Sequence, residues 1–232
     1  MTAPMPSIES SVADFAMSLA QGLNVVDVGC GLQPYRPLFM HTKYVGIDVE
    51  TSGRTAETKQ ADLYFDGINI PLESHSIDAV LCTEVLEHAV DPERLMGEIF
   101  RILRPGGRLC LTVPFIWGLH ELPYDFRRFT PFGLEKMVSE QGFVVERQEK
   151  LTIGTSAILK LIGSEVNNFL VNVAPTQKMT PTEMRWFRFK VLCSEQLLRA
   201  LARIWNSTLR FERVYIDNLL IAYKPKLACS VR

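Results

Sequence analysis

The chain has 232 residues, of which 47% are hydrophobic and 22% charged, and its formal net charge is -1. This length supports one large hydrophobic core, and the composition is typical of a folded soluble protein. The low net charge excludes a general attraction to polyanions, so a nucleic-acid binder would need a local basic patch. Five scattered cysteines without a Cys-x-x-Cys pair indicate reduced thiols in a cytoplasmic protein and argue against a zinc site.

The first 20 residues contain no basic segment followed by a long apolar run, so no signal peptide is expected. Instead, Ile8, Val12, Phe15 and Leu19 recur at helical spacing. Residues at this spacing share one face of a helix. The segment is therefore predicted to form a short amphipathic helix on the main sheet.

Strand and helix signals alternate from residue 24 to about residue 149. The dipeptides Asp91-Pro92 and Thr130-Pro131 mark helix starts, with a capping side chain before a proline at the first helical position. Runs of apolar, strand-forming residues lie between the helical segments. The predicted strands are 24–28, 43–48, 60–63, 77–83, 108–114 and 143–148.

This alternation predicts parallel strands joined by crossover helices. With a last strand at 218–223, the fold class is α/β, with a doubly wound, mostly parallel seven-stranded sheet. From Leu151 the pattern changes to two helical stretches, 157–173 and 182–204. We expect a single domain over 1–232, with an α/β core formed by 1–150 and 214–224 and a helical insertion at 151–213.

The stretch VVDVGCGLQPY joins the first predicted strand to an open loop with two glycines. In open α/β sheets, ligands bind beyond the carboxyl ends of the strands, where this loop lies. A dinucleotide fingerprint needs a third glycine, but Pro34 takes that position and offers no N–H to a phosphate. Asp48 ends the next strand, where a carboxylate can accept both hydroxyls of a ribose. The pattern therefore favours a nucleoside cofactor without a phosphate.

Four segments follow one another along the chain, namely VVDVGCG, YVGIDVE, ADLYFDGINIPLESHSIDAVLCTEVLEH and RPGGRLCLTVPF. Together they resemble the class I S-adenosylmethionine-dependent methyltransferases, in particular the small-molecule enzymes related to ubiquinone and menaquinone methylases. The resemblance covers residues 23–149, about half of the chain. It implies a Rossmann-like fold, S-adenosyl-L-methionine as the cofactor, S-adenosyl-L-homocysteine as the product, and no metal.

Carried over by this resemblance, the first two segments supply one half of the cofactor site. Asp27, Gly29 and Gly31 match the motif whose backbone lies along the methionine part of the cofactor. Asp48 matches the acid that binds the ribose. These four residues are therefore the first candidates for cofactor binding.

The third segment supplies the other half of the cofactor site in the same way. Asp62, with Leu63 beside it, falls where the family places an acid near the adenine amino group, and Asp66 is the alternative. Thr83 and Glu84 match the segment that passes under the sulfonium and the methionine amino group. All of these except Asp66 are predicted to bind the cofactor.

The segment PFIWGLHELPYDFRRFTP follows the fifth strand, in the loop where this fold recruits its acceptor. We predict His120 as the general base and Asp125 as the second catalytic residue. Tyr124 and Arg127 are predicted to bind the substrate. In the alternative interpretation, His120 is a surface residue and Asp125 pairs with Arg127 or Arg128 to fix the loop.

The other histidines carry less of a pattern. His88 precedes the helix start at Asp91-Pro92, and we expect it to pack under the sheet, with a position that faces the site as the alternative. His41 and His75 are expected in surface turns. None of the three is predicted to bind the cofactor or the acceptor.

The helical insertion is basic at its end, since residues 178–232 hold 11 Lys or Arg and 4 Asp or Glu. Trp186, Phe187 and Phe189 alternate with basic residues there, a pattern compatible with a membrane surface. The insertion is expected to form an acceptor pocket, a lid or an interaction surface, with peripheral membrane contact on the inner face or homodimer contact. The alternative is a solvated basic face.

The function expected from these observations is transfer of a methyl group to a small-molecule or glycan acceptor, with oxygen favoured as the methylated atom. Two alternatives stay open. One is an RNA or protein methyltransferase that uses the basic C-terminal surface, although no RNA-binding module is recognised and a nucleic-acid partner is not favoured. The other is a non-catalytic scaffold that retains the cofactor fold.

Overall fold

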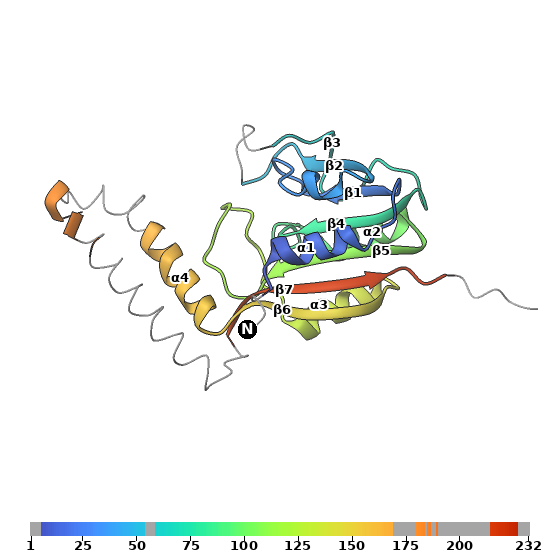
Figure 1. Ribbon diagram of the computed structural model, residues 1–232. Coiled ribbons are helices and arrows are strands. Elements are labelled where there is room, and N and C mark those ends of the chain that lie inside the picture. The colour runs from blue at the N-terminus through green and yellow to red at the C-terminus, as the bar shows by residue number, and fades with distance from the viewer. Residues whose placement is uncertain are drawn as a thin grey trace, which may run out of the picture. The chain divides into compact units, whose positions relative to one another are not determined.

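The computed structural model describes residues 6–53, 59–168, 180–183, 185–186, 189 and 214–226. Seven strands form one sheet in the order β3-β2-β1-β4-β5-β7-β6 (Figure 1). Neighbouring strands from β3 to β5 pair in parallel, and β7 runs antiparallel to β5. The doubly wound, mostly parallel α/β sheet is therefore confirmed. The strands are β1 Asn24–Val28, β2 Lys43–Val49, β3 Leu63–Phe65, β4 Ile77–Thr83, β5 Leu103–Pro114, β6 Val144–Ile153 and β7 Tyr215–Tyr223.

Three of the helices begin at a side chain that caps their first turn. Ser7, Asp91 and Thr130 each accept a hydrogen bond from the backbone N–H three residues later. Such a bond satisfies one of the unpaired N–H groups at a helix start. The two helix starts predicted at Asp91 and Thr130 are confirmed. The helices are α1 Ile8–Met17, the 3-10 helix η1 Arg36–Phe39, α2 Pro92–Ile102, α3 Pro131–Glu140 and α4 Thr155–Asn168.

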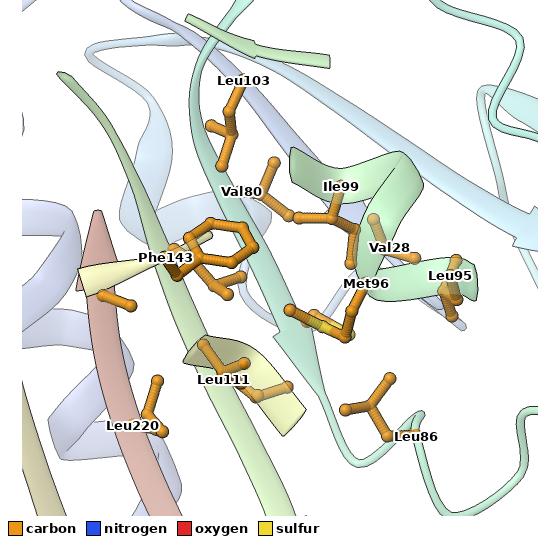
Figure 2. Packing of buried hydrophobic residues seen from close by; sticks show 14 of the residues in the cluster. Val28, Val80, Leu86, Leu95, Met96, Ile99, Leu103, Leu111, Phe143 and Leu220 are labelled. Atoms are coloured by element: carbon orange, nitrogen blue, oxygen red, sulfur yellow. The ribbon is translucent and has the colours of Figure 1, made fainter. Parts of the chain in front are cut away.

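Helices α2 and α3 cover one face of the sheet. The apolar stripe of α2, with Leu95, Met96 and Ile99, is buried against strand residues such as Val80 and Leu111 (Figure 2). Burying each such side chain stabilises the fold by about 1.5 to 3 kcal/mol before the entropy cost is counted. This layer fixes β4 and β5, whose carboxyl ends carry predicted site residues.

Helices α1 and η1 cover the opposite face of the sheet (Figure 1). Val12, Phe15 and Leu19 are buried there, as the helical spacing predicts. Phe39 of η1 belongs to the same apolar cluster. The two layers explain why strands β1 and β4 are almost wholly buried, since side chains on both of their faces contact helices.

Four strands, β3, β5, β6 and β7, differ from the sequence prediction by three residues or more at one end. Strand β3 covers Leu63–Phe65 rather than 60–63, and although its three residues are apolar, they are too few for an alternating pattern to mark where the strand starts. Strand β5 begins at Leu103 rather than at 108, so Pro105, Gly106 and Gly107 lie within an irregular first part of the strand. The β3 shift moves its carboxyl end from Leu63 to Phe65, which changes the acid found there.

The chain divides into two compact units. The first unit consists of residues 1–115, 119–151 and 217–232, and the second unit consists of residues 116–118 and 152–216. In the second unit, the Nζ of Lys160 lies 5.3 Å from the centre of the Trp117 ring. Within the described residues, no helix has the length and apolar content needed to cross a membrane. The division into one domain with an insertion at 151–213 stays a prediction.

Candidate functional site

The glycine loop after β1 is fixed by backbone hydrogen bonds to β2. The N–H groups of Gly29 and Cys30 both donate to the carbonyl of Ile47, at 2.8 and 3.1 Å. Gly29 has φ +72°, and a Cβ at this position would lie 2.3 Å from Cγ2 of Val85. Gly31 also has a positive φ, of +53°. Glycine is therefore required at position 29 for both the backbone conformation and the space.

Asp48, at the carboxyl end of β2, holds the same loop from the other side. Its Oδ2 accepts a hydrogen bond from the N–H of Gly31 at 2.8 Å, and its Oδ1 accepts one from the N–H of Val49 at 2.7 Å. The Nζ of Lys59 lies 4.0 Å from Oδ1. The structure thus brings the two predicted motifs into direct contact.

A pocket of about 600 Å³ opens beside this loop, at the carboxyl ends of β1, β2 and β4. Six of the predicted cofactor residues line it, namely Asp27, Gly29, Gly31, Asp48, Thr83 and Glu84. Further residues that were not predicted from the sequence to bind the cofactor also line this pocket. Among them are Tyr35, Ser52, Lys59, His88 and Glu121.

Asp27 is a buried acid in the wall of this pocket. The hydroxyl of Tyr44 donates a hydrogen bond to its Oδ2, whereas its Oδ1 has no hydrogen-bond partner among the described residues. Burial raises the pKa of Asp27 to about 7, the bond from Tyr44 lowers it, and the nearby charge of Asp48 raises it further. The pocket wall therefore contains one carboxylate oxygen that needs a donor.

The carboxyl end of β4 turns sharply at Glu84, which has φ +55° although it is not a glycine. Its N–H donates to the carbonyl of Thr112 at 3.0 Å, and its Oε1 accepts from the Thr112 hydroxyl at 2.8 Å. A backbone conformation of this kind costs energy and is common where a binding site fixes it. Thr112 of β5 thereby holds the segment that contains Thr83 and Glu84.

Asp62 lies before β3 and does not line the cofactor pocket. Its Oδ2 accepts hydrogen bonds from the N–H of Gly46, at 2.8 Å, and from Arg36. Asp66 follows β3 directly and lines a second pocket of about 650 Å³, which shares Val49 with the first. Strand β3 starts later than the sequence indicated, so Asp66 rather than Asp62 lies at its carboxyl end, and the cofactor-binding roles of Asp62 and Leu63 stay predictions.

Asp125 organises the loop after β5. It binds Arg128 through both carboxylate oxygens and accepts a hydrogen bond from the N–H of His120 at 3.0 Å. Nδ1 of His120 lies 3.3 Å from Oδ2 of Asp125. The hydrogen bonds from Arg128 lower the pKa of Asp125 to about 2, so this carboxylate stays ionised. Asp125 can therefore orient His120 but is a poor proton acceptor at neutral pH.

His88 faces the site, contrary to its predicted position under the sheet. It lines both pockets, and its Nε2 lies 3.2 Å from Nε2 of His120. Its Nδ1 lies 2.8 Å from the carbonyl oxygen of Tyr124. Burial lowers the pKa of His88. The turn after β4 and the loop after β5 meet at this contact, which a sequence pattern does not show.

Arg127 and Tyr124 differ in their relation to the pockets. The guanidinium of Arg127 donates hydrogen bonds to the carbonyls of Ala89 and Val90, at 2.6 and 3.2 Å. Tyr124 lines the second pocket. Arg127 thus joins the loop after β5 to the segment before α2, while Tyr124 lies where it can contact a ligand.

The predicted basic surface of the insertion falls mostly outside the described residues, as does Phe187. Among the described residues, Trp186 and Phe189 are exposed, with ring centres 6.0 Å apart, and they line a hollow of about 510 Å³ together with Arg185. Membrane contact, homodimer contact and a cytoplasmic location stay predictions.

Residues 26–111 match a family model described as a methyltransferase domain. The chain is 32% identical over 117 residues to a malonyl-[acyl-carrier protein] O-methyltransferase of Alcanivorax borkumensis, a match that covers 45% of this chain and 39% of the relative. It is 34% identical over 106 residues to a sterol 24-C-methyltransferase of Schizosaccharomyces pombe, over 40% of this chain and 28% of the relative. The matches thus span well under half of these relatives.

Solved structures share the fold at low sequence identity. The [4+2]-cyclase SpnF aligns with a TM-score of 0.60 and 17% identity, over 94% of this chain and 81% of SpnF. Phosphoethanolamine N-methyltransferase 2 of Haemonchus contortus, in complex with S-adenosyl-L-methionine, aligns with a TM-score of 0.56 and 16% identity, over 94% and 52%. The match over residues 26–111 thus identifies a methyltransferase domain in this part of the chain, and the solved structures show that the chain shares the fold of a methyltransferase that binds S-adenosyl-L-methionine.

Proposed function

We propose that this protein transfers a methyl group from S-adenosyl-L-methionine to a hydroxyl group of a small-molecule or glycan acceptor. The observation that carries the proposal is the pocket at the carboxyl ends of β1, β2 and β4, which combines the glycine loop with Asp48. An imidazole, that of His88, lines the same pocket and supplies a group that can accept a proton.

The residues present fit this cofactor in chemical terms. The unpartnered Oδ1 of Asp27 suits the ammonium group of the methionine part, because a buried carboxylate oxygen needs a donor. Asp48 lies where a carboxylate binds ribose hydroxyls. Asp66 replaces Asp62 in our proposal as the acid on the adenine side, since it follows β3 and lines the adjoining pocket with Val49.

When bound, S-adenosyl-L-methionine supplies a methyl group activated on a sulfonium. The protein holds the acceptor in line with this group, and such positioning is worth up to roughly 7 to 11 kcal/mol. As the acceptor oxygen took up this methyl group, its hydroxyl proton would move to the imidazole pair. In this pair His88 lines the pocket, and His120, oriented by Asp125, lies behind it.

The methylated atom is part of the proposal. The proteins to which this chain is similar include an O-methyltransferase, a sterol C-methyltransferase and a phosphoethanolamine N-methyltransferase by name, so they do not decide between atoms. A neutral amine attacks through its own lone pair, whereas a hydroxyl requires a proton acceptor for efficient attack. The imidazole at the pocket therefore favours oxygen.

The first test is a calorimetric titration of the purified chain with S-adenosyl-L-methionine and with S-adenosyl-L-homocysteine, with NAD as the control ligand. We expect both sulfur nucleosides to bind and NAD not to bind. Acceptors are then screened with labelled S-adenosyl-L-methionine, and transfer to hydroxyl compounds but not to their deoxy analogues is expected. Absence of binding by either nucleoside would refute the proposal, and transfer only to amines would refute the choice of oxygen.

A further inference from the structure

Three potential metal ligands converge beside the cofactor pocket. Glu87, His88 and His120 each offer one ligand atom, and these three atoms all lie within 4.8 Å of one another. We propose that these residues bind one divalent transition-metal cation of the Zn²⁺ type. The prediction of a metal-free protein, implied by the family resemblance, is revised by this proposal.

The partners of the two imidazoles fix where their protons lie. Nδ1 of His88 lies 2.8 Å from the carbonyl oxygen of Tyr124, and a carbonyl can only accept. Nδ1 of His120 lies 3.3 Å from the carboxylate of Asp125, which also only accepts. We therefore assign the hydrogen of each imidazole to Nδ1, which leaves a lone pair on each Nε2 atom.

These two lone pairs lie on adjacent atoms, since the Nε2 atoms are 3.2 Å apart. Two lone pairs at this distance repel each other unless a positive centre binds both of them. A tetrahedral cation with metal–nitrogen bonds of about 2.0 to 2.1 Å separates two ligand nitrogens by roughly 3.3 Å. The separation of 3.6 Å between Nε2 of His88 and Oε1 of Glu87 is also close to this edge length.

Glu87 gives independent support, because it is a buried carboxylate without a hydrogen-bond partner. Its exposed fraction is 0%, and neither side-chain oxygen accepts a hydrogen bond from the described residues. Its carbonyl accepts a hydrogen bond from the N–H of Phe126 at 2.8 Å, which fixes the backbone. Ionising a buried carboxyl group that accepts no hydrogen bond costs several kcal/mol, and a bound cation would offset this cost.

The surroundings of the two imidazoles match those of metal-bound histidines. Such histidines usually donate their second N–H to a backbone carbonyl or a carboxylate, which fixes the ring orientation. The carbonyl of Tyr124 and the carboxylate of Asp125 take these two places, and Arg128 holds Asp125 through both oxygens. Asp125 is thus assigned a positioning role behind a metal ligand.

Three protein ligands leave a coordination position for a water molecule or a substrate atom, as in catalytic zinc sites. His88 lines both pockets, so a cation bound to it would lie next to them. What the cation does in methyl transfer rests on the proposed function, in which it would hold and polarise the acceptor hydroxyl. A cation and a proton compete for the same two Nε2 lone pairs. With the cation bound, the imidazoles could not accept the proton of the acceptor hydroxyl, and the cation would promote loss of that proton instead.

The test uses the full chain after removal of metals with a chelator and dialysis. Calorimetric titration with ZnCl₂ is expected to show one site, and Co²⁺ in its place is expected to give the visible absorption of a tetrahedral complex without a thiolate charge-transfer band. The absence of a thiolate charge-transfer band distinguishes this site from a site in which cysteine binds the metal. No saturable Zn²⁺ binding, or a Co²⁺ spectrum with thiolate ligation, would overturn the proposal.

Matched variants assign the site to its residues. Glu87→Gln and His120→Gln each remove one ligand, and we expect Zn²⁺ affinity to fall by more than about tenfold, because even outer partners of metal ligands are worth that much. His41→Gln is the control, since His41 contacts the carbonyl of Ala16 elsewhere in the fold. Equal affinities in Glu87→Gln and His41→Gln would overturn the assignment. Circular dichroism shows whether each variant folds.

Titration with S-adenosyl-L-homocysteine separates this inference from the proposed function. If the nucleoside binds and Zn²⁺ does not, the metal site is overturned and the proposed function stands. The contact between the two Nε2 atoms would then be explained by a proton shared between the imidazoles. Zn²⁺ binding at Glu87 and His120 without nucleoside binding supports the metal site and refutes the proposed function. The two results come from the same preparation and do not depend on an acceptor.

Discussion

The carboxylate of Asp48 accepts a hydrogen bond from the backbone N–H of Gly31 at 2.8 Å, so the end of β2 and the glycine loop after β1 form one unit. Asp48→Ala removes this bond together with the one from Val49. We expect the affinity for S-adenosyl-L-homocysteine to fall by more than about tenfold, because hydrogen bonds to a charged group contribute roughly 1.5 to 3 kcal/mol. Calorimetry measures this, and unchanged affinity would contradict the role of Asp48.

Asp62 and Asp66 allow a paired test of the adenine side. Asp66 lines the pocket that adjoins the glycine loop, whereas Asp62 binds Gly46 and Arg36. Asp66→Ala is therefore expected to weaken nucleoside binding, and Asp62→Ala is expected to leave it unchanged in protein that remains folded. Titration of both variants with S-adenosyl-L-homocysteine measures the difference. The reverse result would restore Asp62 as the binding residue.

Gly29→Ala should disrupt the loop for two separable reasons. The positive φ costs an alanine roughly 1 to 2 kcal/mol, and the new Cβ would lie 2.3 Å from Cγ2 of Val85. We expect nucleoside binding to be lost in Gly29→Ala and partly restored in the double variant Gly29→Ala/Val85→Ala, where only the backbone cost remains. Val85→Ala alone is the control. No recovery in the double variant would show that the contact with Val85 is not the main obstacle.

Asp27 is expected to make stability depend on pH. Its pKa is about 7 in the folded chain and near 3.8 ordinarily, so the folded state holds more protons than the unfolded state between about pH 4 and pH 7. Its contribution is therefore most favourable below this window and is lost as the pH rises through it.

Asp27→Asn should remove this contribution, because an amide does not titrate in the range. Urea unfolding at about pH 5 and about pH 7.5, without cofactor, gives the change in free energy of unfolding for each protein. We expect a smaller loss between the two pH values in the variant than in the unchanged chain. Equal losses would mean that Asp27 ionises normally.

Arg127 was predicted to bind substrate, but its guanidinium contacts the carbonyls of Ala89 and Val90. Arg127→Ala should therefore lower the free energy of unfolding by about 1 to 2 kcal/mol, as expected for the loss of charged hydrogen bonds to the backbone. Once an acceptor is known, its KM should not change. A raised KM with unchanged stability would return Arg127 to the substrate site.

The sequence predicts well those parts of the fold in which burial decides the structure. Strands β1 and β4 have the predicted bounds, because most of their residues are apolar and the strands are followed by Gly29 and Glu84. Strand β3 has only three residues, which are apolar but largely exposed, so burial does not define its bounds and its start was predicted three residues too early. The glycine loop and Asp48 could be found because their roles depend on backbone geometry at fixed strand ends.

The histidine contact could not be found in the same way. His88 and His120 are 32 residues apart in two irregular segments, so no periodicity relates them. Sequence also does not show which of two adjacent arginines binds Asp125. In the structure Arg128 binds Asp125, whereas Arg127 donates a hydrogen bond to the backbone carbonyl of Ala89 before α2. Loop chemistry of this kind is decided by tertiary contacts rather than by local pattern.

Strand β7 lies between β5 and β6 in the sheet, although it follows both in the chain. Eight of its nine residues are buried. During synthesis, β5 and β6 leave the ribosome before the strand that joins them, and their facing edges lack a partner until residues 215–223 are available. A nascent chain without these residues would expose two open strand edges, which are sites of aggregation. Completion of the sheet is therefore a late event in the folding of this protein.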